Sequence, residues 1–385
     1  MRVSRLMALC GASLVMIGCG GSADSPSALT TTRDSTGGIL RIRHVGEAPV
    51  WTPVEVMTIG SVDEGPNSFA RIRSILLGHD GGVLVADAGN KVVREFGPDG
   101  AYRRDIGRDG AGPAEYREPY SLAWIGDTLA LLDPSNARVG LFQRDGSWAG
   151  QWRSPVITGP SHVRLYPSGE GGLYLIGFSQ RGRLFIGHGP AGPTDTLSDL
   201  PPREGITTFI RCDWPNNAGM RFYEVPFAPG RLQIPGPGNA FLVANTERYQ
   251  IFSVTPAGDT LRVLEREVGP PVPITDAEWD ERTAEWRKDR AEDATLQCPV
   301  SSIPRPGSKP ALDDWFLADD GTLWVDRWTV SGRVTEVFSP NGDLLGAFPA
   351  IERNRNVVPS ARGNRLAVVV NDEDGIPFVK VFELR

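Results

Sequence analysis

The stretch IGSVDEGPNSFARIRSI, from Ile59 to Ile75, recurs in altered form 47 residues later as IGRDGAGPAEYREPYSL, from Ile106 to Leu122. The two copies align without a gap, with Ile-Gly, four residues, Gly-Pro, an aromatic residue and a Ser at equal offsets. A period of about 40–50 residues is typical of propellers and other repeat arrays. The first copy precedes any complete unit, so the repeat region begins with half a unit.

The sequence continues each copy with a second shared block. DAGNKVVREFGPDGAYRRDIG begins at Asp87, and DPSNARVGLFQRDGSWAGQW begins at Asp133. At a spacing of 46, four pairs of positions match: Asp87 with Asp133, Asn90 with Asn136, Val93 with Val139, and Phe96 with Phe142. Each block predicts an apolar strand, a turn, an alternating strand that ends in Phe, an Asp-Gly turn and a further strand, which together form a short antiparallel meander.

The Phe of this block can be followed towards the C-terminus. It stands at six positions: Phe96, Phe142, Phe185, Phe252, Phe338 and Phe382. Three intervals, of 46, 43 and 44 residues, are one repeat long, whereas those of 67 and 86 residues are a repeat plus insertions of roughly 20 and 40 residues. Six markers predict six units. The alternative is an irregular β protein in which the matches arose by chance.

The last unit ends just after Phe382 and lacks the final strand that the other units have. The half unit at the start, VWTPVEVMTIGS from Val50, supplies such a strand. A ring closed in this way hides the edges that an open sheet would expose. The sequence therefore predicts an all-β fold, a six-bladed β-propeller over residues 39–385 that is closed by its N- and C-terminal strands.

The composition agrees with an all-β protein and argues against some partners. Of the 385 residues 40% are hydrophobic, and 45 Gly, 32 Pro and 10 Trp make the chain rich in turn formers and aromatic residues. The formal net charge is −7 and no block of Lys and Arg stands out. Nucleic acid and anionic membrane surfaces are therefore not expected as partners.

The N-terminus carries a targeting signal that is separate from the fold. Arg2 and Arg5 precede the apolar run LMALCGASLVMI, which is too short to span a bilayer, and MIGC places Cys19 after a small Gly. This pattern resembles a bacterial lipoprotein signal peptide over residues 1–18, with lipidation of Cys19 and a flexible polar tether over residues 19–38. The alternative is an ordinary signal peptide with an incidental Cys.

The segment GGVLVADAGNKVVREFGPDGAYRRDIG, from Gly81, resembles an NHL-type propeller blade. From about residue 40 the chain resembles the six-bladed β-propeller proteins that are common among bacterial lipoproteins, although blades three to six lack the Asp-x-x-Asn turn. The resemblance implies an architecture and a cell-envelope location, and it does not imply a reaction. A membrane contact is expected through the lipid anchor only, and Gly20 favours the outer membrane, facing the periplasm or the cell surface.

Two insertions, at about residues 201–231 and 273–310, are predicted to follow the outer strands of blades three and four. Such connections emerge on one face of a propeller, where loops often carry binding residues. The second insertion contains ITDAEWDERTAEWRKDRAED, and Thr275 as N-cap predicts a short helix. Cys212 and Cys298 lie one in each insertion, so a disulfide between them would make a cap over part of the channel mouth. Two free thiols are the alternative.

Arg and aromatic residues on this face are candidate ligand-binding residues, because such side chains bind anionic, sugar-like or carboxylate-bearing ligands. They are Arg71, Arg73, Tyr116, Arg117, Arg211, Trp214, Arg221 and Tyr223. The expected partner is a small molecule, a glycan or an envelope protein. The alternative is a set of rim residues that pair with an acidic surface.

Asp and Asn side chains that follow a blade's second strand are candidate metal ligands: Asp87, Asn90, Asp133 and Asn136. Sugar lactonases of propeller fold bind calcium with oxygen ligands of this kind, so calcium is the one cofactor considered. The competing interpretation is that these side chains cap tight turns, and it is favoured here. The four His have no ligand-like spacing, which disfavours zinc.

The sequence thus favours an exported, lipid-anchored propeller that binds a ligand or a protein partner at its capped face without catalysis. Two alternatives stay open. One is a calcium-dependent lactonase-type hydrolase or an NHL-type lyase. The other is a structural scaffold in the cell envelope.

Overall fold

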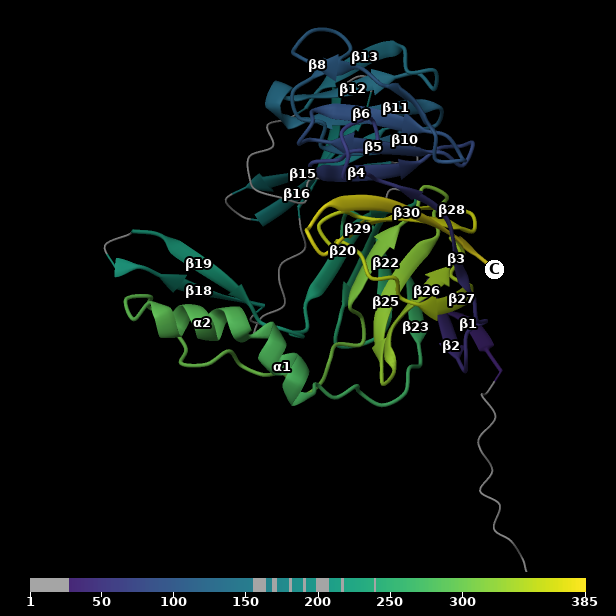
Figure 1. The fold of residues 1–385 in the computed structure, drawn as a ribbon. Helices are drawn as coiled ribbons and strands as arrows, with labels where there is room; N and C mark the ends of the chain where they lie inside the picture. Colours follow the sequence, from purple (N-terminus) through teal and green to yellow (C-terminus); the bar gives the residue numbers. More distant parts are fainter. Residues whose placement is uncertain are drawn as a thin grey trace, which may run out of the picture.

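The chain folds into six small antiparallel sheets that form the blades of a propeller (Figure 1). The structure is a computed structural model and describes residues 28–154, 164–167, 172–179, 182–189, 192–198, 208–215, 218–238 and 240–385. The predicted signal peptide, Cys19 and the first part of the predicted tether lie outside these residues. Within them, the prediction of a six-bladed propeller is confirmed.

Each blade is a meander whose first strand is innermost. Blade one contains β4 (Ile72–Leu77), β5 (Val83–Asp87), β6 (Val92–Phe96) and β7 (Tyr102–Asp105). Blade two contains β10 (Ser121–Ile125), β11 (Thr128–Asp133), β12 (Arg138–Phe142) and β13 (Trp148–Arg153). Blade three contains β14 (Leu165–Pro167), β15 (Leu173–Ser179), β16 (Gly182–Gly189) and β17 (Gly192–Ser198). A 3-10 turn, η1 (Pro134–Asn136), joins β11 to β12, and β8 (Arg108–Asp109) pairs with β9 (Glu115–Tyr116) between blades one and two.

The remaining blades follow the same order. Blade four contains β20 (Arg231–Gly236), β21 (Ala240–Asn245), β22 (Gln250–Val254) and β23 (Thr260–Arg266). Blade five contains β24 (Asp314–Leu317), β25 (Leu323–Thr329), β26 (Gly332–Phe338) and β27 (Leu344–Pro349). Blade six contains β28 (Ser360–Arg362), β29 (Arg365–Asn371), β30 (Pro377–Leu384) and β3 (Pro53–Ile59). The innermost strand β4 lies beside both β28 and β10, and β10 lies beside β14, so consecutive blades adjoin at the centre.

The N-terminal strand β3 is the outer strand of blade six, which confirms the predicted closure of the ring. It pairs antiparallel with β30, from Pro53 opposite Leu384 to Ile59 opposite Val379. The backbone N–H of Thr52 also donates to the last carbonyl of the chain, at 2.8 Å. Blade six therefore has four strands like the other blades, and its outer edge is not left open.

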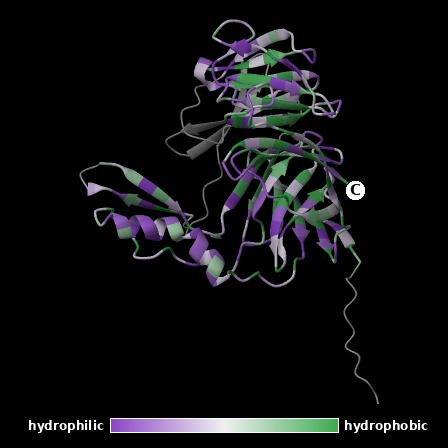
Figure 2. Cartoon of the chain, in the orientation of Figure 1, coloured by the Kyte–Doolittle hydropathy of each residue, from purple (hydrophilic) through white to green (hydrophobic). Residues whose placement is uncertain are grey.

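Three of the six repeated Phe residues end the third strands of their blades and lie in the core. Phe96 and Phe142 are fully buried, and Phe338 is 1% exposed. A register shift precedes each of the three, so a β-bulge marks the same place in each blade. In blade four this place is taken by Val254, two residues after Phe252. Because a shift of two keeps a side chain on the same face of a strand, the predicted number of units is unaffected. Figure 2 shows the hydrophobic residues concentrated on the blade strands.

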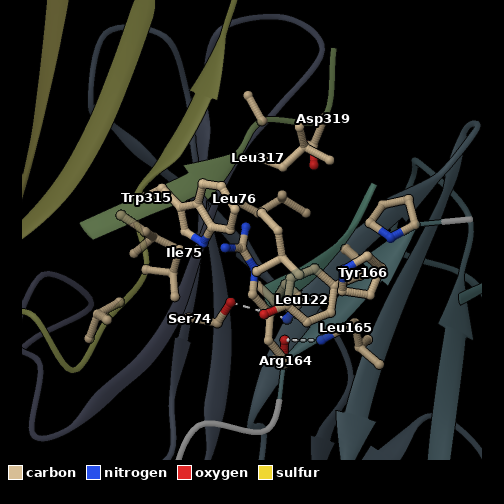
Figure 3. Close-up of a pocket in the computed structure, with 18 of the residues that line it drawn as sticks. Ser74, Ile75, Leu76, Leu122, Arg164, Leu165, Tyr166, Trp315, Leu317 and Asp319 are labelled. Carbon is tan, nitrogen blue, oxygen red and sulfur yellow. Dashed lines mark hydrogen bonds between the residues drawn. The ribbon is translucent and has the colours of Figure 1, made fainter. Parts of the chain in front are cut away.

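Serine hydroxyls link the innermost strands of neighbouring blades, and they explain the Ser shared by the two copies of the opening stretch. Ser74 Oγ accepts a hydrogen bond from the backbone N–H of Leu122 at 3.1 Å, and Ser121 Oγ accepts one from Leu165 at 3.0 Å (Figure 3). Ser360 makes the equivalent bond from blade six to blade one. Each hydroxyl satisfies a buried N–H at the junction between two sheets, where an unpaired group would cost about 1–3 kcal/mol.

The segment placed in the tether by the sequence analysis differs in the structure. Strands β1 (Thr30–Thr36) and β2 (Ile39–Val45) form a hairpin, and β2 adds in parallel to β23 at the rim of blade four. His44 anchors the hairpin: one ring nitrogen lies 2.9 Å from Thr31 Oγ1 and the other 2.8 Å from the carbonyl of Gly342. Burial lowers the pKa of the His44 imidazole. Every side chain of β1 is exposed, which is why its sequence looks like a tether.

The two insertions pack together as a lobe made of β18 (Phe209–Asp213), β19 (Met220–Glu224), α1 (Asp276–Arg282) and α2 (Ala284–Glu292) (Figure 1). Thr275 and Glu278 form the predicted capping box. The predicted single helix is instead two helices, because the backbone leaves helical geometry at Thr283. Among the described residues no helix is both long and apolar enough to cross a membrane.

A disulfide between Cys212 and Cys298 joins the two insertions, as predicted. It adjoins a small core that contains Ile210, Tyr223 and Trp286. The predicted cap over the channel is only partly correct. Figure 1 shows the lobe standing beside blades four and five, at a distance from blades one and two at the opposite end of the view. The lobe therefore forms a wall at one side of the mouth.

Candidate functional site

The innermost strands enclose a cavity of about 770 Å³ at the centre of the propeller (Figure 3). Its lining comes from β4, β10, β14, β20 and β24, and from the segment 354–358 that precedes β28. All six blades thus contribute to one cavity, which is the central channel. Volumes of a few hundred to a thousand Å³ are usual for small-molecule sites.

Five arginines line this channel: Arg71, Arg73, Arg164, Arg231 and Arg355. They come from four blades, with Arg71 and Arg73 both in blade one, and they lie at the end where the innermost strands begin. We call this group the arginine mouth. At the other end of the same strands lies Asp319, whose carboxyl pKa is raised by burial. The five arginines thus share their end of the channel with Asp314, the first residue of β24. Asp319 and Asp320 follow the other end of that strand, and the Arg164 charge acts against the raised pKa of the Asp319 carboxyl.

Arg73 is presented to the channel by a β-bulge. In the pairing of β4 with β5, Ile72 lies opposite Asp87 and Ser74 opposite Ala86, so Arg73 is the extra residue of the bulged strand. Bulges re-aim a side chain and are frequent beside functional sites. The Arg73 guanidinium carbon lies 5.1 Å from the centre of the Tyr120 ring, and its Nε is buried without a hydrogen-bond partner. Buried N–H groups normally have a partner, so this unpaired group makes Arg73 a candidate contact for a ligand.

Few carboxylates neutralise the mouth. Arg355 pairs with Asp313. In the part of the chain that the structure describes, Arg71, Arg73 and Arg164 form no ion pair, and Arg164 instead lies 5.4 Å from the centre of the Tyr166 ring. Unpaired guanidinium groups beside aromatic faces give the channel entrance a local positive potential in a chain whose net charge is −7.

Asp314 lines the channel as well, as do Asp319 and Asp320, and Arg353 pairs with Asp314. The Arg353 guanidinium lies 2.9 Å from the Asp314 carboxylate and 2.8 Å from that of Asp326. Burial raises the pKa of the Asp314 carboxyl, while the nearby Arg353 charge acts against that shift. Arg353 is therefore the ion-pair partner of Asp314, and Arg355 of the mouth also interacts electrostatically with the Asp314 carboxylate.

Of the predicted ligand-binding residues in blades one and two, Arg71 and Arg73 line the channel and the other two do not. Tyr116 is 1% exposed, and its hydroxyl donates to the carbonyl of Ile106 at 2.7 Å and accepts from the N–H of Val93 at 2.8 Å. Tyr116 therefore braces the loop between blades. Arg117 is exposed outside the channel, and its backbone N–H donates to Asp133.

The four predicted residues from the first insertion belong to the lobe. Arg211 pairs with Asp213 at 2.8 Å. The Trp214 indole N–H donates to Asp293 at 2.7 Å. The remaining two contact acidic groups of α2: Arg221 pairs with Glu285 and Asp289, and the Tyr223 hydroxyl donates to Asp289. These contacts hold the β18–β19 hairpin on α2.

The four candidate metal ligands make the contacts of turn-capping groups. The Asp87 carboxylate accepts hydrogen bonds from the backbone N–H groups of Ala70, Arg71, Gly89 and Asn90 and from the Asn90 side chain. Asp133 accepts equivalent bonds from Arg117, Glu118 and Asn136. In the described residues no three His, Cys, Asp or Glu are grouped to hold a metal. Converging N–H donors suit a carboxylate that fixes a loop and do not suit a calcium site, which needs free oxygens.

Sequence analysis missed the arginines of blades three, four and six. Arg164 and Arg231 lie at the start of the innermost strands β14 and β20, and Arg355 lies five residues before β28. The repeat spacing contains a signal for Arg164. This residue stands 43 residues after Ser121, and 43 residues is also the interval between the repeated Phe142 and Phe185. An alignment of innermost strands, instead of the Phe blocks, would have found it.

The fold and the site together define a six-bladed β-propeller with an arginine-lined channel. No protein-family model matches the chain, and a search of curated proteins finds no match. Solved structures that are similar include a protein described as exported from Bacteroides fragilis (13% identity, covering 87% of this chain and 94% of that one, TM-score 0.45). Virginiamycin B lyase from Staphylococcus aureus is also similar (10% identity, 84% and 98% coverage, TM-score 0.41).

A calcium-binding protein, regucalcin from Agrobacterium tumefaciens, gives a third match, with 12% identity, 87% and 96% coverage and a TM-score of 0.37. At these identities and TM-scores the likeness says nothing about the activity or the ligand of this chain. The number of blades follows from the sheets themselves. The NHL-like and lipoprotein assignments stay predictions.

Proposed function

We propose that this chain is a non-catalytic binding protein whose arginine mouth holds an anionic ligand. The observation that carries the proposal is Arg73, a bulged residue with a buried, unpartnered Nε and no carboxylate partner among the described residues. A planar guanidinium matches the geometry of carboxylate and phosphate groups and can bind them in a bidentate manner. Arg71, which directly precedes the strand of Arg73, and Arg164, which precedes the innermost strand of blade three, supply charge to the same cavity.

The position of these groups favours recruitment of an anion from solution. The mouth lies inside a cavity with protein walls, which focus the field of charged side chains. Tyr120 and Tyr166 place aromatic faces against Arg73 and Arg164, which holds the guanidinium groups without satisfying their N–H donors. A ligand with one acidic group gains charge-assisted hydrogen bonds there and displaces little existing pairing.

Replacement of Arg73 by Gln is the direct test of this proposal. One charge-assisted contact is worth about 1.5–3 kcal/mol, so R73Q is expected to weaken binding of inorganic phosphate or citrate about 10- to 100-fold. Isothermal titration calorimetry at low salt measures the effect. R117Q is the matched control, because Arg117 is an exposed arginine outside the channel and its loss is expected to change the affinity little. Equal affinities of wild type and R73Q, or no binding to wild type, would contradict the proposal.

The disulfide between Cys212 and Cys298 fits an extracytoplasmic protein, because such bonds persist in oxidising compartments. We propose further that Cys19 carries a lipid anchor in the outer membrane, which the N-terminal sequence supports. C19A is expected to abolish incorporation of a fatty-acid analogue and to release the protein from the membrane fraction. Labelling of C19A at the wild-type level would contradict the anchor and leave the anion site untouched.

A further inference from the structure

A second cavity, of about 520 Å³, lies between the lobe and blades four and five. Arg231, Leu232 and Arg355 line both this cavity and the channel, so the two spaces meet at the arginine mouth. The lining is rich in aromatic side chains: Phe209, Phe222, Tyr223, Phe227, Trp286 and Trp328. The channel entrance therefore adjoins a cavity whose lining combines these aromatic rings with charged side chains such as Arg282 and Glu285.

Two of these aromatic residues are exposed in a way that a structural role does not explain. Phe209 is 59% and Phe222 is 57% exposed. On the β18–β19 hairpin they alternate with Ile210, Cys212 and Tyr223, which are buried in the lobe core. The lobe is thus already packed through the other face of the hairpin. Its outer face would ordinarily be polar, and two exposed Phe side chains that line a cavity mark a surface that binds an apolar group.

Phe227, another aromatic residue of the lobe cavity, has an unusual backbone conformation. Its φ angle is +60°, in the left-handed region that a bulky residue rarely adopts. The ring lines the lobe cavity and meets Trp328 edge-on, with the ring centres 5.7 Å apart. Backbone strain of this kind concentrates at ligand-binding sites, where the fold holds a side chain in a required position.

We infer that the ligand is an amphiphilic anion. Its acidic group binds at Arg73 in the channel, and its apolar part, an acyl chain or an aromatic ring system, extends past Arg231 and Arg355 into the lobe cavity against Phe209 and Phe222. This inference rests on the proposed function and specifies the ligand class. The two cavities share Arg231, Leu232 and Arg355 as lining residues, and the lobe cavity presents the exposed rings of Phe209 and Phe222. A ligand with an acidic group and an apolar part can therefore contact both the arginine mouth and these rings.

The test uses 8-anilinonaphthalene-1-sulfonate, an aromatic sulfonate that fluoresces in apolar surroundings, and inorganic phosphate, which has only the anionic part. F209S/F222S is expected to weaken binding of the sulfonate about tenfold or more, because two apolar contacts are lost, while phosphate affinity stays unchanged. R73Q is expected to weaken both. L261S removes an exposed apolar side chain from the outer strand β23 and serves as the control. Near-UV circular dichroism verifies that each variant keeps its native packing.

The outcomes separate the two proposals. If F209S/F222S binds the sulfonate as wild type does, the amphiphile inference is wrong and the anion site stands. If R73Q binds phosphate as wild type does, the proposed function is wrong. Competition with dodecanoate and with 2-naphthoate then distinguishes an acyl ligand from an aromatic one. If neither compound displaces the sulfonate, the inference is wrong.

Discussion

A variant that begins at Ser61, and therefore lacks β3, is expected to lose cooperative unfolding and to aggregate. Removal of β3 strips Met57 and Ile59 from the core of blades six and one, where they are 7% and 1% exposed. Losing two such side chains costs about 4–10 kcal/mol, which is comparable with the whole stability of an ordinary domain. The edge of β30 is then open to pairing with other molecules.

A series of N-terminally truncated chains separates the effect of losing β3 from the effect of losing the residues before it. A chain that begins at Ala28 retains every described residue and is expected to unfold like the full chain. A chain that begins at Val50 loses the β1–β2 hairpin, with fully buried Ile42, but keeps β3. It is expected to be destabilised and still monomeric. Denaturant titration and size-exclusion chromatography measure both properties. A monomeric, cooperatively folded chain from Ser61 would show that the ring does not need its closing strand.

Ring closure could be predicted from the sequence, whereas the β1–β2 hairpin could not. The half unit before the first complete repeat and the missing strand at the end are both visible as strings of residues. The segment Thr30–Thr36, TTTRDST, has neither apolar alternation nor a buried side chain. It is a strand only because β2 beside it is held to blade four by Ile42, His44 and the parallel ladder with β23. Tertiary context of this kind overrides local preference.

The candidate site was predicted in part. Arg71 and Arg73 lie in the opening repeat, and their place before an innermost strand indicated the channel. The bulge that turns Arg73 into the cavity is a feature of strand register and leaves no mark in the sequence. The insertion residues Arg211 and Arg221 were expected at the channel mouth, but they lie in the lobe. The direction in which an insertion projects cannot be predicted from its composition. The acidic partners of these two arginines in the lobe hold them beside the channel.

Replacement of both cysteines by alanine, C212A/C298A, is expected to destabilise the lobe selectively. The disulfide joins residues 86 apart, and the chain-entropy model gives about 4.5 kcal/mol for a loop of this length. The lobe core is small, with Ile210, Tyr223 and Trp286 among its buried residues, so it has little stability to spare. Ala is chosen over Ser because Cys212 is fully buried and a hydroxyl there would add a polar cost of its own.

Limited proteolysis and hydrogen exchange measure the loss of stability separately for the lobe and for the blades. In a chain that begins at Ala28, which contains no other cysteine, C212A/C298A is expected to expose β18, β19 and α2 to trypsin while the blade strands stay protected. Reductant should give wild type the same pattern and leave the double variant unchanged, which attributes the effect to the bond and not to the substitutions. Because Phe209 and Phe222 lie on the same hairpin, the variant should also lose sulfonate binding while keeping phosphate binding at Arg73. A lobe that stays protected in the double variant would mean that its small core, together with the contacts of Arg221 and Tyr223 to α2, is sufficient to hold it against the propeller.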